Sequence, residues 1–384
     1  MKIAIAGTRG VPPAYGGFET FAAELGTRLV ARGHDVTVYC RSNGGQAPPP
    51  VRDAPDDRRG RLSSTGMWNG IHRIVLPAFG GKYFETVSHT FFSALDALRR
   101  DFDVILLCNA VNAFAIPLLR AARIPVAINV DGIERKRRKW NILGRTAYAI
   151  GEALSAHFAR VIADAEVIAS YYRDNYAIEP VVIPYGAEFP IEDDSDILTR
   201  LGLTKRNYIL YVSRFEPENN PLEVVEAYER LNPHSSVLSP PPLVMLGQGL
   251  YARELVKQLE AHESKNILFP GALYGADYRT LQRHALVYIQ ATEVGGTHPA
   301  MIEAMASGGF VLAHDTPENR EVGGDAVRYF ELRPIETLSG TLRECLAGID
   351  EMDGFRARAK ARARERFGWE RVTDAYERLF HELA

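Results

Sequence analysis

Cysteine is scarce in this chain of 384 residues, and the three cysteines, Cys40, Cys108 and Cys345, lie far apart. Their odd number and wide spacing argue against a disulfide scaffold and against a zinc site built on cysteine pairs. We therefore expect a protein that works in a reducing cytoplasm.

Long apolar runs are also missing, because charged residues interrupt every apolar stretch well short of the roughly 20 residues of a spanning helix. The chain has no charged, then apolar, leader of the kind that directs secretion. No membrane span and no signal peptide are predicted. The composition, 46% hydrophobic and 24% charged, is typical of a globular protein, and the length suits about two to three domains.

Charge of one sign does not dominate, since the net charge is −3. Residues 1–187 nevertheless contain 23 Lys and Arg against 17 Asp and Glu, whereas residues 188–384 contain 22 against 31. The first half is the better candidate for an anionic partner, with a chance asymmetry as the alternative. A negative total charge argues against nucleic acid as a partner.

The compact glycine fingerprint of dinucleotide-binding folds is absent as well. The opening MKIAIAGTRGVPPAYGGFET runs from a buried strand at 3–6 into a loop and then a helix from Phe18, with the next strand at 35–40. Gly7 and Gly10 are separated from Gly16 and Gly17 by a long spacer. An NAD-dependent oxidoreductase is thus disfavoured. The loop lies at the carboxyl end of a parallel strand, where α/β sheets bind ligands, although an ordinary strand–helix loop is the alternative.

The rest of the chain repeats the alternation of strand and helix. The first series continues with predicted strands at 103–108, 126–130, 161–163 and 181–184, and residues 43–66 are polar and rich in proline, which predicts a long loop. A second series has predicted strands at 208–213, 243–246, 267–269, 287–290 and 310–313, with helices at 221–231, 250–264, 276–284 and 300–307.

This pattern predicts an α/β protein of two Rossmann-like domains that face each other across a cleft. We expect the first domain at 1–187 and the second at 188–365. Residues 366–384 carry an amphipathic stripe of large apolar side chains and are predicted to form a helix that packs back on the first domain.

Two segments of the second domain have phosphate-binding character. Arg214 directly follows a buried strand and is followed by the amides of Asn219 and Asn220, a combination able to hold a phosphate through charge-assisted bonds. In EVGGTHPAMIEAMASG, residues 293–308, a strand again meets a glycine pair and a helix start. Glu303, about one turn into that helix, is placed to accept hydrogen bonds from a vicinal diol such as a ribose.

Three residues of the first domain are candidates for catalysis. Asp131 follows the buried strand at 126–130, Asp164 ends the strand at 161–163, and Tyr185 lies where the pattern breaks between the domains. Capping of a helix is an equal alternative for Asp164, whereas Asp131 precedes a glycine and is explained less well by capping.

These motifs together resemble one enzyme family. They are GTRGVPPAYGGFETFAAEL, DGIERKRRKW, IPYGAE, SRFEPENN, GGTHPAMIEAMASG and FGWERVTDAYERLF, and they cover essentially the whole chain. The sequence resembles the retaining GT-B glycosyltransferases of family four. It is most similar to their rhamnosyltransferase branch, which acts in bacterial capsule and O-antigen synthesis.

The resemblance implies where a nucleotide sugar binds. Arg214 would hold the diphosphate and Glu303 the ribose, while Gly271 and Ala272 would lie near the base. The remaining implied contacts are those of Gly295, Gly296 and Thr297 to the distal phosphate and sugar, and of Gly16 and Gly17 to the phosphate from the first domain. No metal and no cofactor are implied.

Two positions depart from the family pattern. Asn219 stands where the broad family has a lysine, and Gly295 stands where it has the first glutamate of an E-x7-E pair that ends at Glu303. Glu293 is near that position but out of register. Both residues resemble what the rhamnosyl branch has at these positions. The sugar specificity of the broad family is therefore a weaker guide for this chain.

The implied activity is transfer of L-rhamnose from dTDP-rhamnose to a hydroxyl of a lipid-linked saccharide, by an enzyme peripheral on the inner face of the plasma membrane. The basic segment beside the implied acceptor site suits an anionic lipid surface; it comprises Arg135, Lys136, Arg137, Arg138 and Lys139 with Trp140. The alternatives are a UDP- or GDP-sugar donor, a sugar-nucleotide epimerase of the same fold, and a non-catalytic sugar-nucleotide binder.

Overall fold

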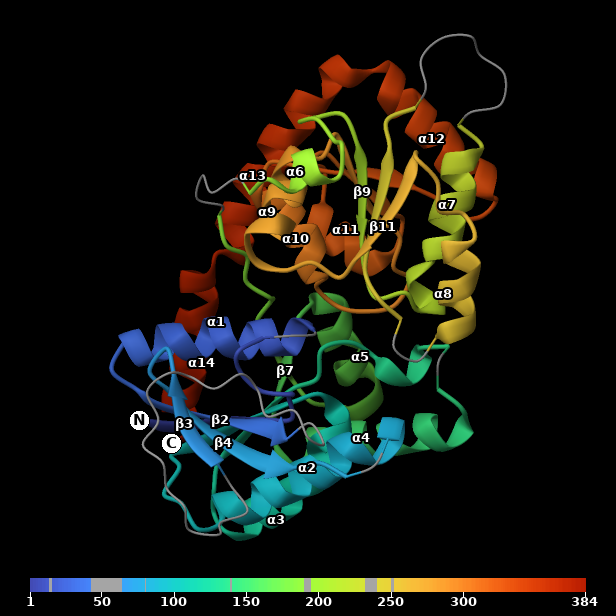
Figure 1. Cartoon of the computed structure of the whole chain (residues 1–384). Helices are drawn as coiled ribbons and strands as arrows, with labels where there is room; N and C mark the ends of the chain where they lie inside the picture. The colour runs from blue at the N-terminus through green and yellow to red at the C-terminus, as the bar shows by residue number, and fades with distance from the viewer. Residues whose placement is uncertain are drawn as a thin grey trace. The chain divides into compact units, whose positions relative to one another are not determined.

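The computed structural model describes residues 1–13, 16–42, 64–79, 81–138, 140–189, 195–231, 240–249 and 252–384. The chain forms two compact units (Figure 1). Unit 1 comprises Met1–Lys136, Trp140–Tyr185 and Trp369–Ala384, and unit 2 comprises Arg137–Lys139 and Gly186–Gly368.

The sheet of unit 1 has eight strands in the order β3-β4-β2-β1-β5-β6-β7-β8. β3 pairs antiparallel with β4, and every other neighbouring pair is parallel. The bounds are β1 Lys2–Ala6, β2 Asp35–Ser42, β3 Ser64–Trp68, β4 Ile71–Pro77, β5 Val104–Cys108, β6 Val126–Asn129, β7 Arg160–Ala163 and β8 Val181–Val182.

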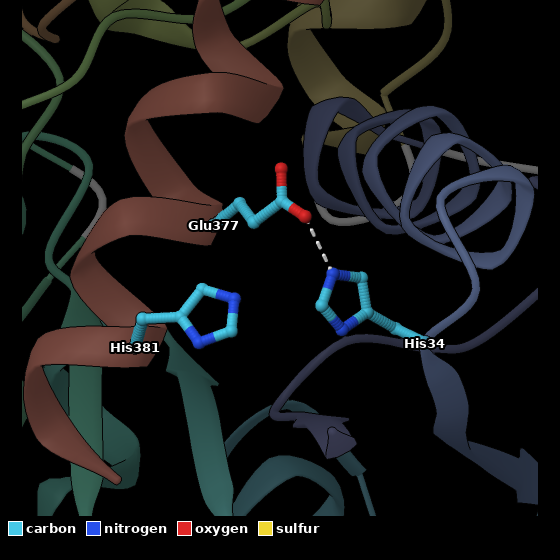
Figure 2. A group of neighbouring side chains, drawn as sticks. All are labelled: His34, Glu377 and His381. Carbon is cyan, nitrogen blue, oxygen red and sulfur yellow. Dashed lines mark hydrogen bonds and ion pairs between the residues drawn. The ribbon is translucent and has the colours of Figure 1, made fainter.

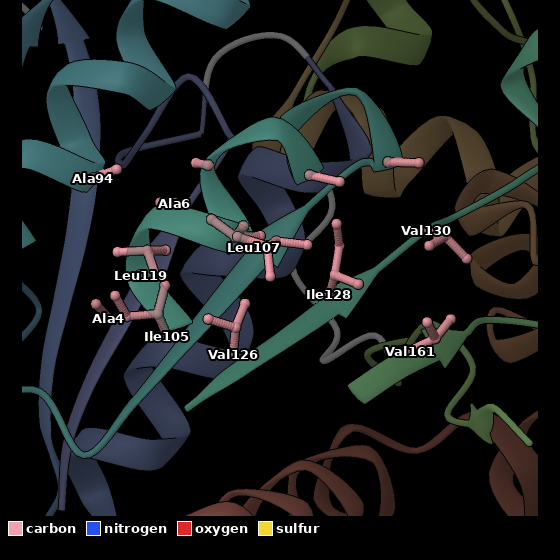
Figure 3. Packing of buried hydrophobic residues seen from close by; sticks show 14 of the residues in the cluster. Ala4, Ala6, Ala94, Ile105, Leu107, Leu119, Val126, Ile128, Val130 and Val161 are labelled. Atoms are coloured by element: carbon pink, nitrogen blue, oxygen red, sulfur yellow. The ribbon is translucent and has the colours of Figure 1, made fainter. Parts of the chain in front are cut away.

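Helices cover this sheet because its central strands are apolar on both faces, as parallel strands are. All five residues of β5 are buried, for example. On one face Ile105, Leu107 and Ile128 belong to a continuous apolar cluster that extends to helices α2 and α3 (Figure 3). The helices of unit 1 are α1 Gly17–Ala31, α2 Gly81–Ala97, α3 Ile116–Ala121, α4 Ile142–Phe158, α5 Glu166–Tyr176 and α14 Trp369–Leu383, with 3-10 turns η1 Ala110–Ala115 and η2 Glu134–Lys136.

Helix α14 brings the C-terminal end of the chain back to unit 1, where it lies beside α1 (Figure 1). The ring of Phe21 on α1 is 5.3 Å from that of Tyr376 and 6.3 Å from that of Trp369, measured between centroids. At the end of the same interface, Nε2 of His34 lies 2.7 Å from Oε1 of Glu377 (Figure 2). The apolar stripe read from the sequence is the buried face of this helix.

Unit 2 contains a six-stranded parallel sheet in the order β11-β10-β9-β12-β13-β14. Its strands are β9 Ile209–Val212, β10 Leu243–Leu246, β11 Ile267–Gly271, β12 Val287–Gln290, β13 Val311–His314 and β14 Arg328–Phe330. Its helices are α6 Ile197–Arg200, α7 Pro221–Glu229, α8 Arg253–Glu260, α9 Gly275–His284, α10 Pro299–Ala306, α11 Pro317–Gly323, α12 Ile335–Ala347 and α13 Met352–Phe367, with 3-10 turns η3 Pro217–Asn219 and η4 Ile349–Glu351.

The predicted α/β class is therefore confirmed, and each unit is doubly wound. One expectation fails in part: residues 64–66, expected to belong to a long loop, lie in β3, which pairs with β4 as a hairpin. The rest of the expected loop, residues 43–63, lies outside the described residues.

Candidate functional site

In unit 2 the strand order reverses at β9, which has β10 on one side and β12 on the other. Ligands of open α/β sheets bind outside the carboxyl ends of the strands at such a reversal. The loop after β9 carries Arg214, and the loop after β12 carries Gly295, Gly296 and Thr297. The predicted donor residues therefore lie at the point of the sheet where a ligand is expected.

Backbone and side-chain hydrogen bonds hold these two loops together. The backbone N–H of Glu293 donates to the carbonyl of Glu218 at 2.9 Å. Nδ2 of Asn220 donates to the carbonyl of Ala291 at 2.8 Å. Asn220 is fully buried and has a left-handed backbone, with φ of 53°, a conformation that asparagine tolerates better than most residues.

The two asparagines after Arg214 are engaged inside the protein. Nδ2 of Asn219 donates to the carbonyl of Arg214 at 2.7 Å, and only 4% of Asn219 is exposed. Together with the bond of Asn220 to the β12 loop, this favours a role in shaping the loop. A direct contact of either amide with a nucleotide sugar stays a prediction. The side chain of Arg214 is half-buried and follows the carboxyl end of β9.

The glycine pair after β12 precedes helix α10, whose N-terminal cap is His298. A Cβ on Gly295 would lie 2.4 Å from Cε1 of His298, so this position accepts glycine alone unless the ring moves. Burial, with a smaller contribution from Arg137, lowers the pKa of His298 to about 3, so the imidazole is neutral near pH 7.

Glu303 on α10 is held by α9. The hydroxyl of Tyr278 donates to Oε2 of Glu303, and Nε2 of Gln282 donates to that hydroxyl at 2.8 Å. Glu303 remains half-buried, so its carboxylate is oriented and still reachable. Gly271, expected near a base, ends β11 with φ of 82° and accepts a hydrogen bond from the N–H of Gly247 at 3.1 Å.

Two arginines of the basic segment, Arg137 and Arg138, belong to unit 2 and are paired with carboxylates there. Nη1 of Arg137 lies 3.5 Å from Oε1 of Glu218, and Arg137 is buried. Nη2 of Arg138 donates to Oε2 of Glu293 at 2.5 Å. Arg137 therefore belongs to the interior of unit 2, and Arg138 has a protein partner.

The neighbouring members of the basic segment lie in unit 1. Nε of Arg135 is 3.2 Å from Oε2 of Glu152, and Arg135 also donates to the hydroxyl of Tyr171. Lys136 is exposed with its ammonium 5.5 Å from the Tyr171 ring, and Trp140 packs on Tyr148. Three of the four described cations of this basic segment are thus ion paired, and Lys139 lies outside the described residues; a contact of the segment with an acceptor or a membrane surface stays a prediction.

In unit 1 the strand order reverses at β1, between β2 and β5. The loop that follows β1 contains Gly7, with φ of 89°, and a Cβ there would lie 2.5 Å from the carbonyl oxygen of Cys108 at the end of β5. This close approach explains the first glycine of the opening motif. Gly16 caps α1, and Gly17 is its first residue.

The three predicted catalytic residues of unit 1 lie near one another. Burial raises the pKa of Tyr185 well above its usual value, and the charges of Asp131 and Asp164 raise it further. The ring of Tyr185 meets the ring of Phe21 on α1 edge to face, with 5.5 Å between the centroids. Asp164 is 1% exposed, and Asp131 is half-buried. The carboxyl ends of β6, β7 and β8 thus carry two carboxylates and a neutral phenol.

Comparison with known proteins gives these sites a context. Residues 15–188 match the model of Glycosyltransferase Family 4, and residues 195–366 match the model of Glycosyl transferases group 1. The chain is a glycosyltransferase of the GT-B type. No curated protein sequence matches it significantly.

Solved structures share the fold along the whole chain. The sucrose-phosphate synthase of Thermosynechococcus elongatus is 18% identical, with a TM-score of 0.79 and coverage of 100% of this chain and 98% of that one. Anabaena HepE in complex with UDP-glucose is 16% identical, with a TM-score of 0.76 and 99% coverage of both. A trehalose-phosphate synthase of Burkholderia xenovorans, in complex with glucose-6-phosphate, is 12% identical, with a TM-score of 0.75 and coverage of 99% and 100%.

Two further residues of this glycosyltransferase join the unit 1 cluster and were missed by sequence reasoning. Nδ2 of Asn129 donates to the hydroxyl of Tyr376 at 2.8 Å, and Oδ1 of Asn129 accepts from the backbone N–H of Asp131 at 2.9 Å. In the sequence, Tyr376 is one of the large side chains of the amphipathic stripe at 366–384. No local pattern could have linked it to a residue 247 positions earlier.

One group in the described part of the glycosyltransferase has the composition of a metal site. Ligand atoms of His34, Glu377 and His381 lie within 4.8 Å of one another (Figure 2). Glu377 already bonds His34 and Nη1 of Arg32, each at 2.7 Å, and the guanidinium adds a positive charge that disfavours a cation. The group is therefore best explained as the polar edge of the α1–α14 contact. Among the described residues, no helix combines the length and apolar character that crossing a membrane requires.

Proposed function

We propose that this glycosyltransferase is a retaining, metal-independent enzyme that transfers L-rhamnose from dTDP-rhamnose to a hydroxyl of a lipid-linked saccharide, at the inner face of the plasma membrane. The observation that carries the donor half of the proposal is the gathering of Arg214 and the 295–297 loop at the strand reversal of unit 2. The retaining mechanism, the sugar and the acceptor rest on the sequence resemblance.

The donor site has the chemistry that a nucleoside diphosphate needs. The guanidinium of Arg214 supplies a fixed positive charge with forked donors. Backbone N–H groups at the glycine pair before α10 supply donors without a side chain in the way. Glu303, oriented by Tyr278, supplies an acceptor for the two hydroxyls of a ribose.

The proposed step needs no covalent intermediate with the protein. The acceptor oxygen forms its bond to the anomeric carbon on the face from which the bond to the diphosphate breaks. The acceptor proton passes to the departing phosphate oxygen. Because charge grows on the phosphate and on the sugar ring, fixed protein charges stabilise the transition state. We assign Arg214 to the leaving phosphate, and Asp131 to the acceptor hydroxyl or the sugar cation, with Asp164 and Tyr185 in support.

The nucleotides named for the solved neighbours support an alternative sugar donor. HepE was solved with UDP-glucose and with UDP, and a trehalose-phosphate synthase is described as UDP-forming. A UDP-sugar is therefore the first alternative to dTDP-rhamnose, ahead of a GDP-sugar. The ion pairs of Arg135, Arg137 and Arg138 weaken the charge argument for a membrane surface, so the lipid-linked acceptor rests mainly on the resemblance.

A binding measurement, followed by a turnover measurement, tests the proposal. Thermal-shift measurements with dTDP-rhamnose, UDP-glucose and a GDP-sugar should show stabilisation by one class of nucleotide sugar. Incubation with that donor alone should release only the slow product of hydrolysis. Rapid formation of an isomeric nucleotide sugar would identify an epimerase, and binding without any turnover would identify a non-catalytic binder. The one-bond coupling between C1 and H1 of the transferred sugar identifies the anomer of the product and so decides between retention and inversion.

A further inference from the structure

A chain of two hydrogen bonds runs from helix α14 to the backbone of Asp131. The hydroxyl of Tyr376 accepts from Nδ2 of Asn129 at 2.8 Å, and Oδ1 of the same side chain accepts from the N–H of Asp131 at 2.9 Å. Asn129 is 1% exposed and Tyr376 is fully buried. No solvent competes for these bonds, so each partner depends on the other.

Asp131 needs such support because its backbone has a left-handed conformation, with φ of 56°. An L-residue enters that region at a cost, and asparagine or aspartate side chains two residues earlier are the usual stabilisers of the turn. Here the stabiliser is the Asn129 side chain at the end of β6. The N–H of Asp131 can only donate, so it turns the amide oxygen toward itself, and the NH2 group then points to the hydroxyl of Tyr376, which accepts from it and anchors the side chain.

Tyr376 is also held in its neutral form. Burial raises the pKa of Tyr376 well above its usual value, the hydrogen bond from Asn129 lowers it, and the charges of Asp164 and Asp131 raise it further. The phenol therefore keeps its proton, accepts from Asn129 and lies within the field of both carboxylates. An aromatic core position alone would need none of these contacts, since phenylalanine packs equally well.

We propose that Tyr376 is a positioning residue for Asp131, acting through Asn129, so that the C-terminal helix α14 contributes to the catalytic site of unit 1. The proposal rests on the proposed role of Asp131. Because a small displacement of a catalytic group is enough to reduce turnover about a hundredfold, loss of this support should have a measurable cost.

The test variant is Tyr376→Phe, which removes the hydroxyl and keeps the ring that packs on Phe21. Tyr172→Phe, at a buried tyrosine of α5 in the same unit, is the matched control. Turnover is measured as hydrolysis of dTDP-rhamnose, or of UDP-glucose if the wild type prefers it. A readout independent of activity is hydrogen exchange of the backbone amides at 130–134.

We expect Tyr376→Phe to lower kcat about tenfold to a hundredfold, with donor Kd and Tm close to the wild type, and to speed exchange at 130–134. Tyr172→Phe should change neither kcat nor the exchange at 130–134. Asn129→Ala should lower kcat at least as much, and adding Tyr376→Phe to it should cost little more, because both act in one chain of bonds.

A wild-type rate in Tyr376→Phe, or additive losses in the double variant, would overturn the proposal. If Tyr376→Phe lowers Tm so far that unfolding accounts for the lost activity, Tyr376 is a residue of the core alone. If the wild type turns over neither donor while exchange at 130–134 still responds to Tyr376→Phe, the positioning contact stands and the proposed function fails.

Discussion

Nη1 of Arg137 lies 3.5 Å from Oε1 of Glu218, and the two side chains are 7% and 0% exposed. No hydrogen bond from the described residues reaches either oxygen of Glu218. Arg137 is thus the charge that balances a fully buried carboxylate in unit 2. This contact explains why one of five consecutive basic residues is turned inward.

Removing this arginine should destabilise the protein. Arg137→Ala leaves Glu218 buried without its counterion, and we expect a loss of about 3–5 kcal/mol in urea-induced unfolding. Lys136→Ala, at the exposed neighbour, should stay within about 0.5 kcal/mol of the wild type. Arg137→Met combined with Glu218→Leu should recover most of the loss. Equal stabilities of Arg137→Ala and Lys136→Ala would refute a stabilising ion pair between Arg137 and Glu218.

The donor assignment predicts a loss of nucleotide affinity in Arg214→Ala. A desolvated partner of a diphosphate is removed, so we expect binding of dTDP or UDP to weaken by about 2–4 kcal/mol. Arg230→Ala, at an exposed arginine that pairs with Glu336, should leave affinity unchanged. Isothermal titration calorimetry checks both variants, and an unaltered affinity in Arg214→Ala would place the diphosphate elsewhere.

The sequence predicted most strands because parallel strands buried on both faces are short apolar runs. Residues 243–246 and 287–290 are strands with those bounds. The β3–β4 hairpin was missed, although its turn residues Asn69 and Gly70 have φ of 48° and 79°. An Asn-Gly pair with two positive φ angles is the strongest short-range hairpin sequence, and its position beside a polar, proline-rich segment hid it.

The candidate site was predictable where it follows strand ends. Arg214, Glu303, Asp131 and Asp164 could be selected because the carboxyl edge of a parallel sheet gathers the loops that bind ligands. The partners that orient these residues could not. Tyr278 donates to Glu303 from another helix, and such pairs depend on packing, which leaves no periodic trace in the sequence.

A buried histidine makes stability depend on pH. Burial lowers the pKa of His89 on α2 to about 4, with a smaller contribution from the charge of Arg41. In the unfolded chain its pKa is about 6.5, so below that value the unfolded state binds the proton first. Stability should therefore be complete above pH 6.5 and fall by up to about 3 kcal/mol as the pH approaches 4.

The variant His89→Leu removes this titration. Measured by urea unfolding between pH 7.5 and 4.5, it should lose less stability than the wild type, while the exposed His157→Gln on α4 should follow the wild-type curve. Parallel curves for the wild type and His89→Leu would show that His89 does not titrate in this range.

Asp131 is the residue to which we assign catalysis, and its backbone dictates the variant that tests it. Alanine at φ of 56° would cost about 1–2 kcal/mol in strain, whereas asparagine tolerates the left-handed region and keeps the shape of the side chain. Asp131→Asn therefore removes the charge with little change in structure. Because that charge acts mainly in the transition state, we expect turnover to fall about 100- to 1,000-fold.

The same variant should keep its nucleotide affinity, since Asp131 is not among the proposed donor-binding residues, and should keep its Tm. Adding Tyr376→Phe to Asp131→Asn should then cost little further, because the hydroxyl of Tyr376 acts through the residue already disabled. Near-normal turnover in Asp131→Asn would move the assignment to Asp164, which lies in the same cluster and is almost fully buried. A variant that fails to fold would instead show that the carboxylate of Asp131 maintains the turn after β6.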